Sequence, residues 1–231
     1  MKTIFHLFSC IFFFSSYCNS QELCSDLLLF DTNTQFEMRA YGATDNLVAI
    51  THYDVENIIE TEDEKKVILS SFNTDSKNPE EPIGNAEYKI ACKQNSLVFH
   101  HRNIIPAFLY DEYSNLELDI SQVLFKMPLN IKVGDTLSDL QFTIKVIATP
   151  ITQKLHYTLT DRCVTGKETI TTPAGTFDCI IIESKTSLKP ENLNAGYVKQ
   201  YYSEGIGFIK QIDYNLKGHV SGVNILTQLD L

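Results

Sequence analysis

The stretch that decides the fold is Gly166–Ile182, GKETITTPAGTFDCIII. Its first half includes Thr169–Thr172, which is β-branched throughout and favours a pleated strand. Pro173 has no N–H for a strand ladder, and Gly175 permits the backbone angles of a tight turn, so both residues belong to the turn. The stretch therefore predicts two strands joined by a tight Pro-Ala-Gly turn.

The returning strand of this hairpin carries apolar residues on both faces. Phe177, Cys179 and Ile181 share one face, because successive side chains of a strand alternate, while Ile180 and Ile182 lie on the other. A strand that is apolar on both faces is typical of a position inside a sheet that is covered on both sides. We therefore expect this strand to be central.

The rest of the chain predicts more strands of the same kind. A second turn-rich block, Tyr201–Asp213 (YYSEGIGFIKQID), contains Gly205 and Gly207, which mark a bend or bulge where two backbones come close. Alternating apolar segments elsewhere indicate roughly ten to twelve strands, about ten to fifteen residues apart. The segment Asn103–Tyr113 is expected to form a short helix or lid, and Asn73–Asn85, with two Pro and one Gly, is expected to be a loop.

Short turns between strands imply antiparallel pairing, because a parallel pair needs a long crossover. The predicted fold class is mainly β: a single curved antiparallel sheet or open half-barrel, with at most one or two short helices.

The N-terminus predicts export. Lys2 precedes the apolar run Ile4–Phe14 (IFHLFSCIFFF), which has the length of a signal peptide and is too short to span a bilayer as a helix. The small residue Ser20 favours cleavage before Gln21, which gives a signal peptide over 1–20 and a single β domain over 21–231. A buried N-terminal helix is one alternative. Lipoprotein cleavage before Cys18 is another, disfavoured because Ser15 stands where that signal has an aliphatic residue. We expect an exported protein of the periplasm, cell surface or extracellular space.

The charge balance excludes one class of partner. Without Lys2, 18 Lys and Arg (19 minus 1) face 29 Asp and Glu, a net charge of −11. So acidic a chain is a poor candidate for binding nucleic acid. No second apolar run approaches the ~20 residues of a transmembrane helix, so no such segment is expected in the mature chain.

Four cysteines remain after cleavage: Cys24, Cys92, Cys163 and Cys179. Export favours disulfides, and four cysteines allow three connectivities. A turn centred on Ala174 would place Cys163 opposite about residue 185 rather than opposite Cys179, so an uninterrupted ladder favours Cys24 or Cys92 as the partner of Cys179. A bulge near residue 166 would change that register. No two cysteines have the close spacing of a structural zinc site, so no metal is expected.

Two motifs are similar to those of a known family. Thr171–Cys179 (TTPAGTFDC) resembles the TTPAGTF-x-C stretch of the TapB-like family (domain of unknown function 3108-like), which are secreted bacterial proteins. Tyr201–Lys210 (YYSEGIGFIK) is similar to that family's WY-x-x-GVG-x-VK stretch, with Tyr201 where the family has Trp. The resemblance implies a curved antiparallel sheet like that of LolA and LolB, which hold acyl chains on a concave apolar face. It implies no catalytic residue.

The sequence predicts no catalytic, cofactor-binding or metal-binding residue. It contains no G-x-S-x-G, no H-E-x-x-H and no phosphate-binding loop. The predicted function is a non-enzymatic exported protein that binds a lipid or other apolar ligand on a concave sheet face. The alternative is a structural or interaction protein of the bacterial envelope or cell surface without a small-molecule ligand. No protein partner is indicated.

Overall fold

The structure is a computed structural model of the chain. It describes residues 31–61, 64–76, 78–93, 96–99, 104–114, 116–120, 125–128, 130–190 and 196–231. The predicted signal peptide, the alternative lipoprotein position Cys18, and Cys24 lie outside the described residues.

The described chain is almost entirely β. The strands are β1 (Gln35–Gly42), β2 (Leu47–Glu60), β3 (Glu64–Asp75), β4 (Asn78–Lys93), β5 (Ser96–Phe99), β6 (Glu117–Ile120), β7 (Phe125–Pro128), β8 (Leu140–Ala148), β9 (Ile151–Thr172), β10 (Gly175–Lys189), β11 (Gly196–Ser203), β12 (Gly207–Asn215) and β13 (Val220–Asp230). One short helix, α1 (Ala107–Glu112), interrupts them. No helix in the described part of the chain is long and apolar enough to cross a membrane.

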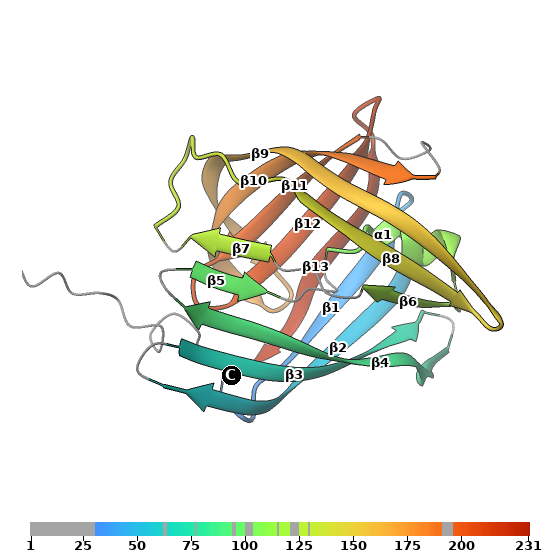
Figure 1. Ribbon diagram of the computed structural model, residues 1–231, viewed down its shortest axis with the longest axis horizontal. Coiled ribbons are helices and arrows are strands. Elements are labelled where there is room, and N and C mark those ends of the chain that lie inside the picture. Colours follow the sequence, from blue (N-terminus) through green and yellow to red (C-terminus); the bar gives the residue numbers. More distant parts are fainter. Residues whose placement is uncertain are drawn as a thin grey trace, which may run out of the picture.

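All the strands form one antiparallel sheet in the order β6-β8-β9-β10-β11-β12-β13-β1-β2-β3-β4-β5-β7. The two edge strands, β6 and β7, are separated in the chain only by residues 121–124. An extended residue spans at most about 3.5 Å, so the two edges of the sheet must come within about 18 Å of each other. The sheet therefore curls into the half-barrel seen in Figure 1.

This architecture confirms the predicted fold class, with a correction to the number of strands. The sheet has 13 strands rather than ten to twelve. Strand β7 has only four residues and ends at Pro128, so its sequence gives little pattern from which to predict a strand.

The segment 73–85 is also not a loop, because β3 and β4 continue through most of it. Irregularities in the β3–β4 register lie after Phe72 and after Thr74, and Thr74 is the partner of Pro82. Bulges of this kind let a strand continue past a residue that cannot donate a ladder hydrogen bond.

The hairpin at Gly166–Ile182 joins β9 to β10, which lie inside the sheet between β8 and β11. Thr172 pairs with Gly175 across Pro173 and Ala174, and Gly175 has a φ of 143°, which a residue with a side chain rarely adopts. Phe177, Cys179, Ile181 and Ile182 of β10 are all buried. The strand is therefore central, as its apolar faces indicate.

The segment that contains α1 packs against the inner face of the sheet at one end. Ile104, Ile105, Ala107 and Leu109 are at most 1% exposed, and α1 contacts β1, β2 and β13. A Cβ on Gly222 of β13 would come within 2.7 Å of the Ala107 Cβ, so glycine there allows the close approach. Side chains of this segment thus fill one end of the half-barrel.

Candidate functional site

A cavity of about 740 Å³ opens at the end of the half-barrel away from α1. It lies between β5 and β7 on one side and β9, β10 and β11 on the other, next to the turn that leads into β12. The α1 segment contacts the opposite end of β12, through Asp213. Cavities of about 300–1,000 Å³ are typical of small-molecule sites, so this is the candidate functional site.

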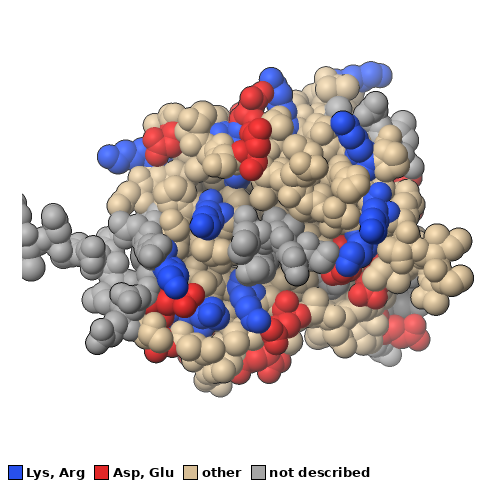
Figure 2. All heavy atoms as spheres, viewed as in Figure 1, with Lys and Arg blue, Asp and Glu red and all other residues tan. Residues whose placement is uncertain are grey.

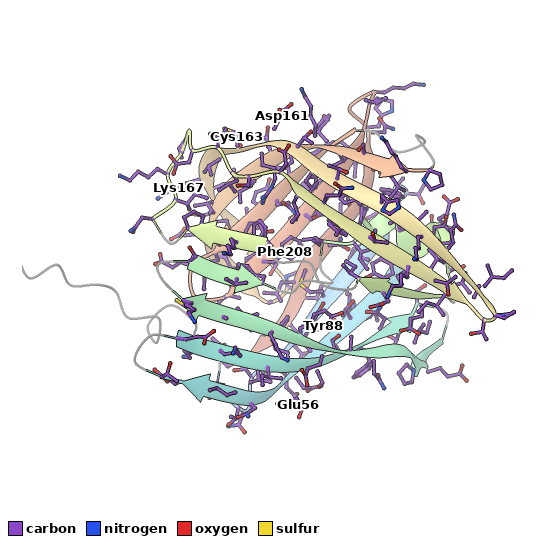
Figure 3. All side chains as sticks on the ribbon, in the orientation of Figure 1. Glu56, Tyr88, Asp161, Cys163, Lys167 and Phe208 are labelled. Carbon is purple, nitrogen blue, oxygen red and sulfur yellow. The ribbon has the colours of Figure 1, made fainter. Side chains whose placement is uncertain are left out.

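The lining of the cavity is divided between apolar and charged groups. Leu97, Met127, Ile131, Ile180 and Tyr202 supply apolar surface. The charged groups are two lysines and three acids: Lys132, Lys167, Glu168, Asp178 and Glu204. Figure 3 shows Lys167 at this end of the half-barrel. An apolar wall beside charges of both signs suits an amphiphilic molecule better than a purely apolar one.

Tyr202, which lines the cavity, belongs to an aromatic cluster with Phe99, Phe125 and Phe208. The Tyr202 ring lies 5.6 Å from Phe125, 6.4 Å from Phe99 and 5.5 Å from Phe208, measured between centroids. Phe208 lies inside the curled sheet (Figure 3). These rings join β5 and β7 to β11 and β12, which are far apart in the sheet order, so side-chain packing draws the walls of the half-barrel together.

Cys179 lines the cavity but is a poor nucleophile. Burial, with lesser contributions from the charges of Asp178 and Glu168, raises the pKa of its thiol to about 12. The thiolate is the reactive form of cysteine, so this thiol is inert at neutral pH. Among the described residues, no group of three or more His, Cys, Asp or Glu could hold a metal ion.

Polar groups link the sheet to the α1 segment at the opposite end. Gln200 donates to Gln211 at 2.8 Å, and the Gln211 amide donates to Asp213 at 3.0 Å. Asp213 also accepts from the backbone N–H of Ala107, and the Asn224 amide donates to the carbonyl of Ile105 at 2.9 Å. The concave face is therefore occupied here by the chain itself.

The cysteines depart from the prediction. Cys163 and Cys179 are free thiols, so the expectation that Cys179 is crosslinked is wrong. Cys163 pairs with Glu183 and Cys179 pairs with Glu168, so the two thiols sit at separate positions along the β9–β10 hairpin. Cys92 is fully buried and is disulfide-bonded.

The four predicted turn residues lie at two hairpins near the cavity. Pro173 and Gly175 form the β9–β10 turn. Gly205 lies in the β11–β12 turn, next to Glu204 of the cavity lining, and Gly207 is the first residue of β12; their φ angles are 81° and 95°. They shape the end of the half-barrel where the cavity opens.

The cavity residues themselves were not predicted from the sequence. Leu97 and Met127 come from short strands that meet β9–β11 only because the sheet curls. Lys132 and Lys167 are 35 positions apart and share no motif. Figure 2 shows acidic and basic side chains interspersed over one face of the molecule, without a continuous patch of either sign there.

The fold and the end cavity define a class of curled antiparallel half-barrels, and the comparisons with known proteins identify the family. Residues 32–226 match the model of the DUF3108-like family, so the chain belongs to that family. This confirms the resemblance carried by the TTPAGTF and GIGFIK motifs. No curated protein matches the chain.

Two solved structures have the same fold. One is a protein of Bacteroides fragilis, proposed to be exported and described as having a YmcC-like fold. It has a TM-score of 0.75 and 16% identity, with 89% of this chain and 99% of that chain covered. The other is a proposed lipoprotein of Parabacteroides distasonis, with a TM-score of 0.73, 18% identity, and 88% and 99% coverage.

Proposed function

We propose that the protein is a non-enzymatic exported protein that binds a lipid or similar amphiphile in its end cavity. The observation that carries the proposal is the cavity of about 740 Å³ with an apolar wall and a charged lining. The neutral thiol of Cys179 favours binding over covalent chemistry.

Export is supported by two independent features. The first 20 residues read as a signal peptide, and two proteins of the same fold are described as a proposed exported protein and a proposed lipoprotein. The site of binding differs from the one expected from the sequence. The α1 segment occupies part of the concave face, so we place the ligand at the opposite end.

The filled end of the half-barrel favours a second candidate, a structural or interaction protein without a small-molecule ligand. Ile104, Ile105 and Leu109 occupy the position that a ligand of the concave face would need. The two candidates differ in whether the end cavity takes up an amphiphile.

The test is native mass spectrometry of the mature protein, followed by titration with a fluorescent acyl probe. We expect a co-purified mass or saturable probe uptake. Ile180→Glu replaces apolar surface of the cavity wall with a charged side chain and should weaken uptake at least about tenfold, because the acyl chain loses apolar contact there. The matched control is Ile151→Glu, since Ile151 is 70% exposed and does not line the cavity. A clean apo mass together with no uptake of the probe would refute amphiphile binding and favour the interaction protein.

A further inference from the structure

Arg162 is a buried cation inside the half-barrel. It is only 3% exposed, on β9, and its guanidinium carbon lies 4.6 Å from the centroid of the Phe125 ring. Its Nη1 donates to the carbonyl of Ser138 at 2.8 Å. These contacts use one nitrogen and one face of the guanidinium.

The other edge of this guanidinium has no hydrogen-bond partner. Nε and Nη2 are both buried and unpaired, and no carboxylate among the described residues forms an ion pair with Arg162. Asp139 acts on it only through longer-range attraction. An arginine stays charged when buried, and a buried charge without a counter-charge is strongly unfavourable. Nε and Nη2 form the edge that pairs with the two oxygens of a carboxylate.

Two unpaired hydroxyl groups lie on the same face of the neighbouring strands. Ser184 of β10 lies opposite the β-bulge that Asp161 and Arg162 form in β9. The register shows this, because Glu183 pairs with Cys163 and Lys185 pairs with Thr160. The Ser184 hydroxyl is buried and unpaired. The hydroxyl of Tyr202, on β11, is also buried without a hydrogen-bond partner in the described chain.

Tyr202 lies between the cavity and the buried polar groups of Arg162 and Ser184. It lines the cavity, and its ring stacks on Phe125, the ring that Arg162 covers. Met127, two residues after Phe125 on the same strand, also lines the cavity. Arg162 does not itself line the cavity: it lies behind the Tyr202 and Phe125 rings, so a ligand reaches its free edge only by passing the Tyr202 side chain.

We propose that the inner end of the cavity accepts the carboxylate of a fatty-acid-like amphiphile, held by Nε and Nη2 of Arg162 with the hydroxyls of Ser184 and Tyr202 as further donors. This proposal rests on the proposed function and names the ligand class. One buried cation matches a single negative charge, and the apolar wall formed by Leu97, Met127 and Ile180 suits an acyl chain. The charged groups at the lining, Lys132 and Lys167 against Glu168, Asp178 and Glu204, add no positive excess, so Arg162 supplies the preference for an anion.

The experiment compares 11-(dansylamino)undecanoic acid with its methyl ester, using the mature protein and fluorescence titration. The two probes share the dansyl group and the acyl chain and differ in charge at about pH 7.5. We expect the acid to bind at least about tenfold more tightly than the ester, because hydrogen bonds to a charged group are among the strongest that proteins make. Arg162→Met should abolish this preference, and Tyr202→Phe should reduce it. Lys185→Met removes a positive charge from an exposed neighbouring position and should leave the preference intact.

The outcomes separate this inference from the proposed function. Equal binding of acid and ester by the wild-type protein would overturn the role of Arg162 while leaving amphiphile binding in place. Binding of neither probe would overturn both. An acid preference that survives Arg162→Met would also refute the assignment to Arg162. The comparison of acid and ester on the wild-type protein needs no variant, so it remains a test even if Arg162→Met fails to fold.

Discussion

The carboxylate of Asp213 lies 3.4 Å from the backbone nitrogen of Ala107, the first residue of α1, and accepts its hydrogen bond. Gln211 donates to both oxygens of the same carboxylate, at 3.0 and 3.3 Å. Burial outweighs these two favourable contacts and raises the pKa of Asp213 from 3.8 to about 7. The segment that fills one end of the half-barrel is thus tied to β12 by a group that changes charge near neutral pH.

We predict that the protein loses stability as the pH rises from about 4 to about 7. The folded state holds the Asp213 proton more tightly than the unfolded chain. The contribution of Asp213 to the unfolding free energy is therefore highest below the unfolded pKa of 3.8, is lost as the pH rises from there to about 7, and is constant above that. The full effect is of the order of 4 kcal/mol. Urea unfolding measured between about pH 4.5 and 8.5 would detect the part of it that falls in this range.

Asp213→Asn isolates this carboxylate. The amide keeps an oxygen to accept from Ala107 but cannot ionise, so the difference in stability between the variant and the wild type should grow with pH. Asp111→Asn, at an exposed position of α1, should follow the wild-type curve. A pH dependence that is unchanged in Asp213→Asn would show that Asp213 does not titrate in this range.

Local sequence patterns were sufficient to predict the antiparallel half-barrel. The β-branched run at residues 169–172, the turn at Pro173 and the apolar faces of β10 each favour the same hairpin, and the structure contains it. The patterns failed where strand length or proline hid a strand. The four residues of β7, which end at Pro128, give little pattern, and the prolines in residues 73–85 concealed a pair of strands that bulges allow to continue.

The candidate site could not be predicted because it depends on contacts between distant parts of the chain. Arg162 and Phe125 are 37 positions apart, and neither belongs to a motif. Arg162 is a single cation within a strand of alternating residues. The sequence alone does not show whether the side chain of such a cation is buried or exposed. The curl of the sheet decides which side chains face the interior.

Tyr202→Phe should not destabilise the protein and should raise its unfolding free energy by up to about 1 kcal/mol. The buried Tyr202 hydroxyl has no hydrogen-bond partner among the described residues, and a desolvated, unpaired hydroxyl is unfavourable. Tyr157→Phe is the matched control, because Tyr157 is equally buried but its hydroxyl is hydrogen-bonded to Thr186. That control should lose about 1 kcal/mol. A loss of stability in Tyr202→Phe similar to that of the control would mean that its hydroxyl is satisfied in solution.

Two glycines of the central hairpin should respond oppositely to alanine. Gly175→Ala should cost about 1–3 kcal/mol, because a φ of 143° is strained for a residue with a side chain. Gly166→Ala, on β9, should be neutral or stabilise by up to about 1 kcal/mol, since its Cβ would lie 3.6 Å from Ile181 Cδ1, an ordinary contact. Thermal unfolding of the two variants tests the pair. Equal effects would show that the backbone at the turn relaxes away from this conformation.

The thiols should differ in reactivity in the folded protein. Cys163 is half-buried and should react with iodoacetamide first, whereas Cys179 is buried with a pKa of about 12 and should react only after unfolding. The mature chain has four cysteines, of which Cys163 and Cys179 are free and Cys92 is disulfide-bonded, so we expect Cys24 to be its partner. Peptide mapping by mass spectrometry without reductant should therefore find Cys24 linked to Cys92 and two alkylated thiols in the denatured protein. A peptide that links Cys179 to any other cysteine would contradict both the free thiol and its place in the cavity wall.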